Sequence, residues 1–507
     1  MFILNKDQLT FADEYTIQNE PIESIQLMER AARACVLKLL KRIDDSNNVA
    51  VFCGKGNNGG DGLAIARMLA ERGYQCKAYV INYTPNFSAD CKTNFEKLKA
   101  HKPDCLIEIN SEEELKKIEL NPNVIIIDAL LGTGTNKPLS GLLASTVNLI
   151  NATACQVISI DCPSGIYIDK ANDKDDVIVH SSLTLTFQYP KLSFLMAQNR
   201  FYVPHFEVLD IGLHHDLEKI MKPNLFFVTK QTIKQILSPR PKFAHKGNFG
   251  HALILAGSDT MRGAALISAK ACLKGGAGLL TVHSTEKVID ALTPYLPEAM
   301  SSIDENKEYI SNLPELTKYD AIAIGPGLGI HIDTQAILKK LLHYNNASLV
   351  LDADALNILS ENKTWLAFLP IETVLTPHPK EFDRLTQEHE NDFERLRSAQ
   401  QFSLNNKCIL VLKGTYTVIC MPDGSCYFNS SGNSGLAKGG SGDTLTGIIT
   451  GLIARGYTPA KAALIGVFVH GYAADLCIKK SSKESLLATE VIDKLDKAFY
   501  KLEKEEK

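Results

Sequence analysis

The sequence lacks several features that would place it in a specialised class of protein. Its 54 Lys and Arg residues do not outnumber its 58 Asp and Glu residues, so the formal net charge is −4. Phosphate binding on a large scale usually shows as a basic excess, and we therefore expect no nucleic-acid partner. No apolar run approaches the roughly 20 residues of a membrane span. The first 15 residues include Asp7 and hold no apolar core of signal-peptide length, so we expect no membrane association.

Paired cysteine motifs are also missing. The chain has 12 cysteines, but none of them form a CxxC pair. Several, such as Cys53 and Cys408, lie in or beside apolar runs that read as strands. Buried free thiols in a reducing cytoplasm explain this pattern better than a disulfide framework or a zinc site. We therefore expect a cytoplasmic protein.

What the sequence does contain is a repeated alternation of strands and helices. A length of 507 residues is too great for one core, so two or three domains are expected. Short β-branched runs alternate with helical stretches, which favours α/β domains with parallel sheets and crossover helices. In the first half we expect strands at 48–53, 76–82, 124–128, 157–161 and 183–187, and in the second half at 251–256, 279–284, 319–325, 348–354, 373–376 and 407–414. A polar stretch at 213–224 marks the expected boundary.

The segment CGKGNNGGDG follows the first of these strands and precedes a helical pattern that Gly73 would end. Its Gly54, Gly56 and Gly59 fit GxGxxG, a weak dinucleotide-binding fingerprint. Glycines allow close backbone approach, and a helix N-terminus attracts phosphate. A usual NAD site also needs an acidic residue at the end of the next strand, but Asn82 stands there. A plain turn with a helix cap is the alternative interpretation.

Two more strand ends carry carboxylates. Asp128 precedes ALLGTGTNKPLSG, and Asp161 precedes CPSG. One such Asp would more often cap a turn. Three loops at the ends of parallel strands, however, should converge on one crevice of the sheet. Oxygen ligands gathered there could also hold a hard cation.

The motifs GKGNNGGDG, DALLGTGTNKPLSG and IDCPSGI resemble the NAD(P)HX epimerase family, the YjeF N-terminal domain, from about residue 5 to 215. The resemblance implies a Rossmann-like three-layer α/β/α domain that interconverts the R and S forms of NADHX and NADPHX, which are hydrated, damaged NADH and NADPH. It implies Asp161 as acid or base and substrate contact, and Asn58, Asp128 and Ser164 as ligands of a potassium ion (K+). The other implied substrate-binding residues are Asn57, Asn58, Gly59, Gly60, Asp61, Gly132, Thr133, Gly134, Thr135, Asn136, Lys137 and Pro138. Lys191 could also line the site, although a surface lysine that keeps its ammonium group in water is the favoured interpretation.

The strongest local signal in the second half is AKGGSGDTLTGIITGLIARG. Glycines crowd ahead of Asp443, and an apolar helix follows. A glycine-rich turn at a helix start forms a backbone anion hole. Asp443 would stand beside a phosphoryl group in that hole and could take a proton from an attacking hydroxyl. An acidic helix cap is the alternative, and the glycine cluster argues against it.

This run resembles the GxGD motif of the ribokinase-like superfamily. Together with AHKGNFGHALILAGS, AIGPGLG, DADALNIL and LTPHPKEFDRL, it resembles the ADP/ATP-dependent NAD(P)HX dehydratase family over about residues 225–500. The resemblance implies that Asp443 is the base and contacts the substrate. The implied substrate-binding residues also include Gly329, His378, Pro379, Lys380, Glu381, Phe382, Asp383 and Arg384. The implied nucleotide-binding residues are Lys413, Gly414, Thr415, Tyr416, Thr417, Asn433, Ser434, Gly435, Leu436, Ala437, Lys438, Gly439, Gly440, Ser441 and Gly442. His378 stands where a related pattern often has Asn.

Together the resemblances predict a bifunctional nicotinamide nucleotide repair enzyme. An epimerase domain (1–215), a linker (216–224) and a ribokinase-like dehydratase domain (225–507) would share one chain. The epimerase would supply the S form, which the dehydratase converts to NAD(P)H. ADP or ATP would be the co-substrate. The fused arrangement resembles bacterial members of the family, which favours ADP. The products from ADP would be AMP and phosphate. The resemblance implies Mg2+ in the second domain and K+ in the first, and we expect a homo-oligomer.

Two alternatives stay open at this point. The second half could be a kinase for a vitamin or a sugar, because its GxGD chemistry would be the same. The motifs GPGLG, LTPHPKEF and DADALN favour the dehydratase. The first half could be a non-catalytic binding module, but the presence of Asn58, Asp128, Asp161 and Ser164 argues against this.

Overall fold

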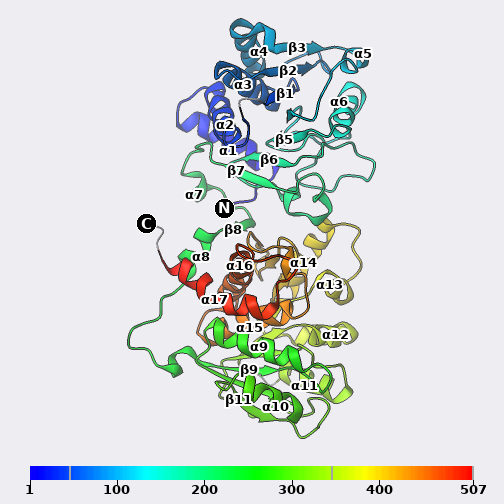
Figure 1. Cartoon of the computed structure of the whole chain (residues 1–507). Helices are drawn as coiled ribbons and strands as arrows, with labels where there is room; N and C mark the ends of the chain where they lie inside the picture. The colour runs from blue at the N-terminus through cyan, green and yellow to red at the C-terminus, as the bar shows by residue number, and fades with distance from the viewer. Residues whose placement is uncertain (45–46, 344–345, 505–507) are drawn as a thin grey trace. The chain divides into compact units, whose positions relative to one another are not determined.

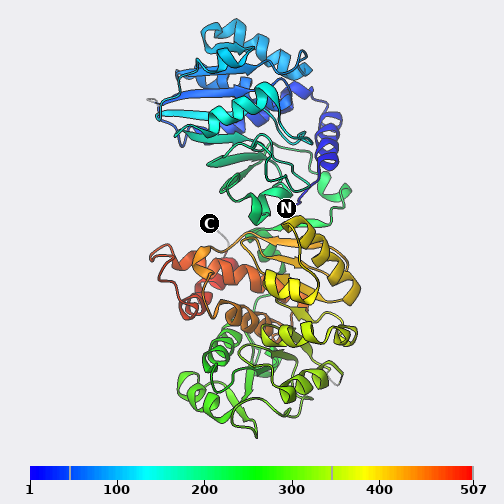
Figure 2. The ribbon, with the colours of Figure 1, turned by 90° about the vertical axis from the view of Figure 1, so that its right-hand side faces the viewer.

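The computed structural model describes residues 1–44, 47–343 and 346–504 (Figures 1 and 2). The chain divides into two compact units. One unit is Phe2–Pro223, and the other begins at Asn224 and also includes Met1. Each unit is built on its own sheet, and the two are described separately.

The first unit contains a seven-stranded sheet in the order β3-β2-β1-β4-β5-β6-β7, in which every neighbouring pair is parallel. The strands are β1 (Asn48–Cys53), β2 (Cys76–Ile81), β3 (Leu106–Ile109), β4 (Val124–Ala129), β5 (Gln156–Ile160), β6 (Leu183–Phe187) and β7 (Phe206–Leu209). The chain moves outward from β1 through β2 to β3 and then returns to β4 on the other side of β1. The strand order therefore reverses between β1 and β4, where α/β sheets usually bind ligands.

Helices cover both faces of this sheet. The helices of the unit are α1 (Lys6–Asn19), α2 (Ser24–Leu39), α3 (Asn57–Glu71), α4 (Ala89–His101), α5 (Glu112–Leu115), α6 (Gly141–Asn151) and α7 (Leu217–Ile220). Successive side chains of a strand point to opposite faces. Val51 of β1 accordingly packs in one core with Leu69 of α3, and Phe52 packs in another with Val147 of α6. The three-layer α/β/α arrangement that the sequence implied is confirmed.

The second unit contains a ten-stranded sheet in the order β11-β10-β9-β12-β13-β14-β15-β16-β17-β8. The strands are β8 (Leu225–Val228), β9 (His251–Leu255), β10 (Leu279–Ser284), β11 (Met300–Ile303), β12 (Ala321–Ile324), β13 (Ser348–Leu351), β14 (Val374–Leu375), β15 (Ile409–Leu412), β16 (Val418–Cys420) and β17 (Cys426–Asn429). The pairs β15–β16 and β16–β17 are antiparallel, so the sheet is mixed. The sequence prediction of a parallel sheet missed this hairpin, because its strands are only three and four residues long.

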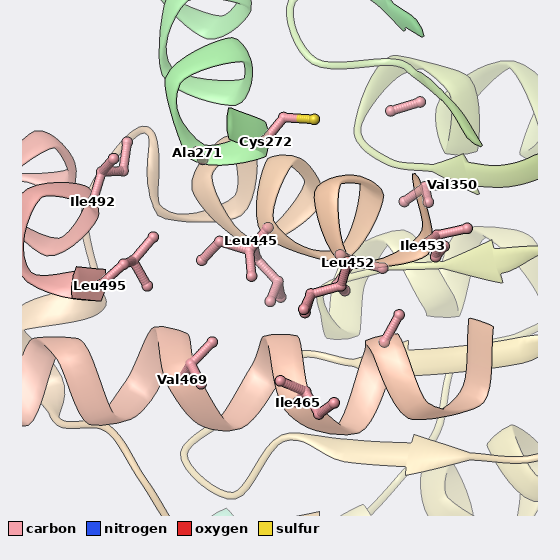
Figure 3. Close-up of a cluster of buried hydrophobic side chains, with 14 of the residues drawn as sticks. Ala271, Cys272, Val350, Leu445, Leu452, Ile453, Ile465, Val469, Ile492 and Leu495 are labelled. Carbon is pink, nitrogen blue, oxygen red and sulfur yellow. The ribbon is translucent and has the colours of Figure 1, made fainter. Parts of the chain in front are cut away.

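One face of this sheet packs against a layer of long helices (Figure 3). The helices of the unit are α8 (Lys230–Ile236), α9 (Arg262–Gly275), α10 (Glu286–Tyr295), α11 (Ile332–His343), α12 (Asp354–Glu361), α13 (Pro379–Leu385), α14 (Asp392–Asn406), α15 (Ser441–Ala454), α16 (Pro459–Cys477) and α17 (Ala488–Glu503). Leu445 and Leu452 of α15 meet Ile465 and Val469 of α16 in this core (Figure 3). Within the described part of the chain, α16 alone is long and apolar enough to cross a membrane. Its most apolar window is 72% buried inside the unit, so packing in the core accounts for its composition.

The predicted strands are confirmed, and most of their ends differ from the predicted ends by no more than two residues. The sequence prediction omitted α1, α2, β3, β7, β8, β11, β16 and β17. The predicted helix after β1 ends near Gly73, whose φ of 91° suits a glycine stop. It begins earlier than expected, at Asn57, so the polar residues of CGKGNNGGDG form its first turns.

Glycines let α9 and α15 approach closely, and this contact offers a test of the fold. A Cβ atom at Gly451 would lie 2.1 Å from the backbone oxygen of Cys272. We expect Gly451→Ala to destabilise the second unit by about 1–3 kcal/mol, because the helices must separate. Gly263, on the exposed side of α9, has open space beside it. Gly263→Ala should stabilise by about 0.5–1 kcal/mol through helix propensity. Urea unfolding of both variants measures the two effects, and equal signs would contradict this packing.

Candidate active sites

The first unit has a cavity of about 640 Å³ at the carboxyl ends of β1, β4 and β5. This is the point where the strand order reverses. The structure brings together eight of the predicted substrate-binding residues in its wall: Asn57, Asn58, Asp61, Gly132, Thr133, Gly134, Thr135 and Asp161. The other five, Gly59, Gly60, Asn136, Lys137 and Pro138, do not line it. Gly59 and Gly60 instead let the start of α3 pack closely, since a Cβ at Gly59 would lie 1.9 Å from the oxygen of Gly54.

The loops after β1 and β4 cross with almost no space between them. The Gly54 amide donates a hydrogen bond to the oxygen of Ala129 at 3.1 Å. A Cβ at Gly54 would lie 1.9 Å from the backbone oxygen of Leu130, so this position requires glycine. The first glycine of the motif therefore joins two strand ends, and Asn57 and Asn58 follow it at the N-terminus of α3 on the cavity wall.

Asp161 directly follows β5 in a strained conformation. Its φ is 61°, a left-handed value that costs a non-glycine residue energy and is typical of functional positions. Its Oδ1 lies 3.0 Å from the Lys191 ammonium and 3.3 Å from the Thr186 hydroxyl. The interpretation of Lys191 as a surface lysine is wrong: the residue is 1% exposed. Its ammonium also donates to the backbone oxygens of Phe187 and Tyr189, so it holds the Asp161 carboxylate from inside the protein.

The three predicted ligands of a potassium ion lie in one buried cluster. The Asp128 carboxylate is fully buried and accepts hydrogen bonds from the Ser164 hydroxyl at 2.5 Å and the Ser164 amide at 2.9 Å. Ser159 and the Leu130 amide also donate to it. Burial raises the pKa of Asp128 in spite of these four donors.

Asn58 carries the clearest sign of a missing partner in this cluster. Its Nδ2 donates to the backbone oxygen of Leu131 at 2.9 Å, and the same oxygen accepts from Ser164. Its Oδ1 is buried and has no hydrogen-bond partner among the residues that the structure describes. An unsatisfied buried oxygen is costly, and a cation would remove that cost. The all-oxygen set of Asn58, Ser164 and the Asp128 carboxylate behind them therefore fits a hard cation such as K+. Asp128 also orients Ser164, which donates to it through both its amide and its hydroxyl.

Sequence reasoning missed the residues that α1 and α2 add to the cavity, chiefly Asp13 and Met28. Neither belongs to a motif, and α1 itself was not predicted. The surrounding protein and then the charge of Asp161 raise the pKa of Asp13 to about 6. Burial, together with Asp161 and Asp13, raises the pKa of Asp61 well above its usual range. Several carboxyl groups therefore share this cavity, and the negative charge of each one makes ionisation of the others less favourable.

In the second unit, Asp443 lies in the first turn of α15, directly after the glycine-rich turn. Gly440 at the N-cap has a φ of 86°, which glycine accepts without strain. A Cβ at Gly442 would lie 3.4 Å from the Lys413 ammonium and 3.6 Å from an Asp352 oxygen. The structure thus brings Lys413 to the N-terminus of α15, where helix amides and a lysine together favour an anion.

Asp352 is a functional candidate that sequence reasoning did not single out. It follows β13, is 1% exposed, and pairs with Lys413 at 3.0 Å. The Thr446 hydroxyl donates to its other oxygen at 2.7 Å. These partners hold the pKa of Asp352 below its usual range although burial opposes them. The next residue, Ala353, has a φ of 46°, so the strand end is strained here as it is at Asp161.

The surroundings of Asp443 raise the pKa of its carboxyl group. Burial and then the carboxylate of Asp352 raise the pKa of Asp443 to about 6, with Lys413 acting in the opposite direction. A carboxyl group with a pKa near the working pH suits proton transfer. This is the protonation behaviour expected of the base that the glycine-rich motif predicted.

The predicted substrate segment His378–Arg384 spans the N-cap and body of α13. His378 caps the helix: its Nδ1 accepts from the Glu381 amide at 3.2 Å, and its own amide donates to Glu381 at 2.8 Å. Glu381 also lies 3.8 Å from Lys413, which links the cap to the anion-binding corner. Pro379 and Lys380 are exposed at the start of the helix. Burial lowers the pKa of His378, which favours the neutral ring.

Two members of that segment have partners in the protein interior. Phe382 is fully buried and packs against the rings of Phe402 and His389. The Asp383 carboxylate pairs with Arg395 at 3.0 Å and with His389 at 2.8 Å. Both side chains therefore stabilise α13; Phe382 is out of reach of a ligand, whereas the Asp383 side chain stays 18% exposed.

Arg384 and Gly329 are connected through α12. The Gly329 amide donates to Asp354 at 2.8 Å. Asn357 donates to the other oxygen of Asp354 and accepts from Arg384 at 2.7 Å. The GPGLG loop and the HPKEF helix, 49 residues or more apart in the sequence, are thus joined by one hydrogen-bonded chain through the DADALN segment.

The predicted nucleotide segments lie before the first strand and after the second strand of the β16–β17 hairpin. Residues 413–417 join β15 to β16, and residues 433–442 follow β17. Asn433 is fixed by Asp475 of α16 at 2.8 Å and caps a short turn through Gly435. The Ser441 hydroxyl lies 3.5 Å from His470, whose pKa burial lowers to about 4. Asp475 and His470 are far away in the sequence, so only the fold identifies them. Among the described residues there is no group of three or more His, Cys, Asp or Glu side chains that could hold a metal.

Comparison with family models matches each unit to a different family. Residues 24–193 match the family described as YjeF-related protein N-terminus. Residues 252–497 match the family described as NAD(P)H-hydrate dehydratase. The two matches fall within the two compact units.

Individual relatives match either the whole chain or its second unit. A bifunctional NAD(P)H-hydrate repair enzyme of Moorella thermoacetica is 33% identical over 100% of this chain and 98% of its own. The corresponding enzyme of Thermofilum pendens is 31% identical over 98% of this chain and 96% of its own. An ADP-dependent (S)-NAD(P)H-hydrate dehydratase of Bacillus subtilis is 39% identical over 55% of this chain and 100% of its own. A solved structure of the ADP/ATP-dependent enzyme of B. subtilis, co-crystallised with ATP/Mg2+, is 35% identical over 55% of this chain and 99% of its own, with a TM-score of 0.49. With relatives of this similarity along its full length, the chain belongs to the family of bifunctional NAD(P)H-hydrate repair enzymes.

Proposed function

We propose that the cavity of the first unit is the epimerase site and that the corner formed by Lys413, Asp352 and Asp443 is the dehydratase site. The chain is a bifunctional NAD(P)HX epimerase and ADP-dependent dehydratase. The assignment of each activity to its site rests on geometry. The observation that carries it is the position of Asp443: it shares the N-terminal turn of α15 with Gly442, and Lys413 lies beside them. We further propose that residues 1–215 and 225–507 are the two functional domains, joined by 216–224.

The dehydratase site supports phosphoryl transfer to the hydroxyl on carbon six of S-NAD(P)HX. The amides at the start of α15, together with Lys413, would hold the transferred phosphoryl group. The Asp443 carboxylate would take the hydroxyl proton as the oxygen attacks. Phosphate then leaves with the carbon–oxygen bonding pair, the ring nitrogen supplies electrons to carbon six, and loss of a proton from carbon five restores NAD(P)H. With ADP as donor the other product is AMP.

The side chains on the remaining sides of this site have separate proposed roles. Gly329, His378 and Arg384 would bind the hydrated nicotinamide nucleotide, and residues 413–417 and 433–442 would bind the adenine nucleotide. The chain Gly329–Asp354–Asn357–Arg384 supports the first group, because it makes these loops one unit. Mg2+ would accompany the nucleotide phosphates, which need a divalent cation to balance their charge.

In the epimerase site, Asp161 is the proposed contact for the nicotinamide ring. Lys191 and Thr186 hold its Oδ1. Its Oδ2 lies next to Gly132, where a Cβ would be 3.5 Å away, so the free side of the carboxylate faces the cavity. A K+ ion at Asn58, Ser164 and Asp128 would fix the two loops that form this wall. We also propose a cytoplasmic location, and assembly as a homo-oligomer stays a prediction.

The first test separates the two activities. Purified R-NADHX and S-NADHX are supplied with ADP, and recovery of NADH is followed by absorbance. We expect Asp443→Asn to lower NADH formation from S-NADHX by about 100-fold or more, because the base is lost. We expect Asp161→Asn to block turnover of R-NADHX while turnover of S-NADHX is kept. If Asp161→Asn impaired both substrates equally, the proposed separation of sites would be wrong.

The second test uses the raised pKa of Asp443. A base works only when ionised, so kcat of wild type on S-NADHX should rise with pH up to about 6 and then level off. The product AMP, separated by chromatography, provides the rate without relying on the acid-labile NADH signal. A rate that falls through this range would mean that Asp443 acts as an acid.

The third test concerns the proposed K+ site and needs no catalysis. The unfolding midpoint of the first unit should rise in KCl relative to choline chloride of equal ionic strength, because a bound ion stabilises the folded state. Asn58→Leu should abolish that difference, since the unpaired Oδ1 is removed. Asn57→Leu is the matched control from the same helical turn. A potassium effect that survives in Asn58→Leu would place the ion elsewhere.

A further inference from the structure

Asp13 lies on the wall of the epimerase cavity, on helix α1, and belongs to none of the recognised motifs. The helix is fixed at both ends. Its first amide, on Lys6, donates to Asp169 at 3.1 Å, and Asn5 and Gln8 form a capping box. Near its end, the Thr16 hydroxyl accepts from the His214 amide at 3.0 Å. Segments that follow β5 and β7 therefore hold α1 over the cavity, and Asp13 is in a defined place there.

The surroundings of Asp13 differ from those of Asp161. Asp161 has a lysine partner at 3.0 Å and a hydroxyl donor at 3.3 Å. No hydrogen bond or ion pair to the Asp13 carboxyl is found within the described chain, and solvent in the cavity reaches it. The titratable groups that face it are Glu14 on α1, Lys6 at the helix start, Asp61 on α3, and Asp161 and Lys191 beyond the ends of β5 and β6. The enclosing protein, Asp161 and Glu14 raise the pKa of Asp13 to about 6, and Lys191 only partly opposes them.

The cavity thus holds one carboxyl group that is paired with a lysine and one that can carry a proton. Asn58, whose buried Oδ1 has no hydrogen-bond partner in the described part of the chain, lines the same cavity and marks it independently as a ligand site. Inverting carbon six through loss of its hydroxyl needs both kinds of carboxyl group. The departing oxygen needs a proton, and the ring that remains is a cation.

We propose that Asp13 is a second catalytic residue of the epimerase, the acid that protonates the hydroxyl of carbon six as it leaves. The proposal rests on the assignment of this cavity to epimerisation. The carbon–oxygen bond breaks, the Asp13 proton completes a water molecule, and the ring nitrogen lone pair forms a double bond to carbon six. The Asp161 carboxylate stabilises this planar cation. Water adds to the opposite face, and the proton that it loses returns through cavity water to Asp13, so atoms and charge balance.

The test uses the full chain, because its own dehydratase reports the S form. R-NADHX is supplied with ADP, the intact dehydratase unit of the same chain converts the S form, and NADH formation gives the rate of epimerisation above the uncatalysed rate. We expect Asp13→Asn to lower kcat on R-NADHX by about 100-fold with little change in KM, because a proton donor contributes about that much. Turnover of S-NADHX by the same variant should be unchanged. Asp7→Asn, which removes a carboxylate from the same helix outside the cavity, should behave as wild type.

A pH profile distinguishes proton donation from a structural role. Wild-type kcat on R-NADHX should fall about tenfold per pH unit above pH 6, as Asp13 loses its proton. Asp13→Asn should lose this dependence, and Asp13→Glu should restore part of the rate together with the dependence. Wild-type kcat in Asp13→Asn, or the same pH dependence in that variant, would overturn the role of Asp13 alone. A wild-type chain unable to convert R-NADHX would overturn the epimerase assignment as well.

Discussion

Both sites depend on a single constraint, the common edge at which parallel strands end. In the first unit, β1, β4 and β5 deliver Asn58, Asp128 and Asp161 to that edge. In the second, β13 and β15 deliver Asp352 and Lys413, which meet at 3.0 Å although they are 61 residues apart. Because backbone pairing fixes the register of neighbouring strands, it also fixes the distance between the side chains that follow them. Loops in close contact, such as those that contain Gly54 and Leu130, then form the walls of the site.

The two sites have the same arrangement of charged side chains. Each has an aspartate that a lysine holds at 3.0 Å, Asp161 with Lys191 and Asp352 with Lys413. In each unit burial, and after it the charge of this paired aspartate, raises the pKa of a second aspartate nearby to about 6. A fixed anion beside a proton-carrying group is a compact way to build acid or base chemistry at neutral pH.

Sequence alone predicted the elements that carry strong local patterns. The β-branched strands and the glycine-rich starts of α3 and α15 are confirmed, because their signals lie within a few residues. It could not place Lys191 inside the protein, since the partner that holds the lysine is 30 residues earlier and only the fold joins them. Asp13 and His470 were missed for the same reason: neither stands in a motif. Asp383 and Phe382 lie in a predicted site segment, yet the packing of α13 turns them toward Arg395 and Phe402.

Asp13 and Asp443 both have a raised pKa, but their proposed roles are opposite. These roles together determine how the whole repair reaction depends on pH. Asp13 donates a proton and works best below its pKa, whereas Asp443 accepts one and works best above its own. Conversion of R-NADHX to NADH needs both steps in series. Epimerisation then limits the overall rate at high pH, and dehydration limits it at low pH, so the two halves are matched in between. Because S-NADHX bypasses the first step, the difference between the two substrates measures the epimerase directly, and this difference should grow as pH rises.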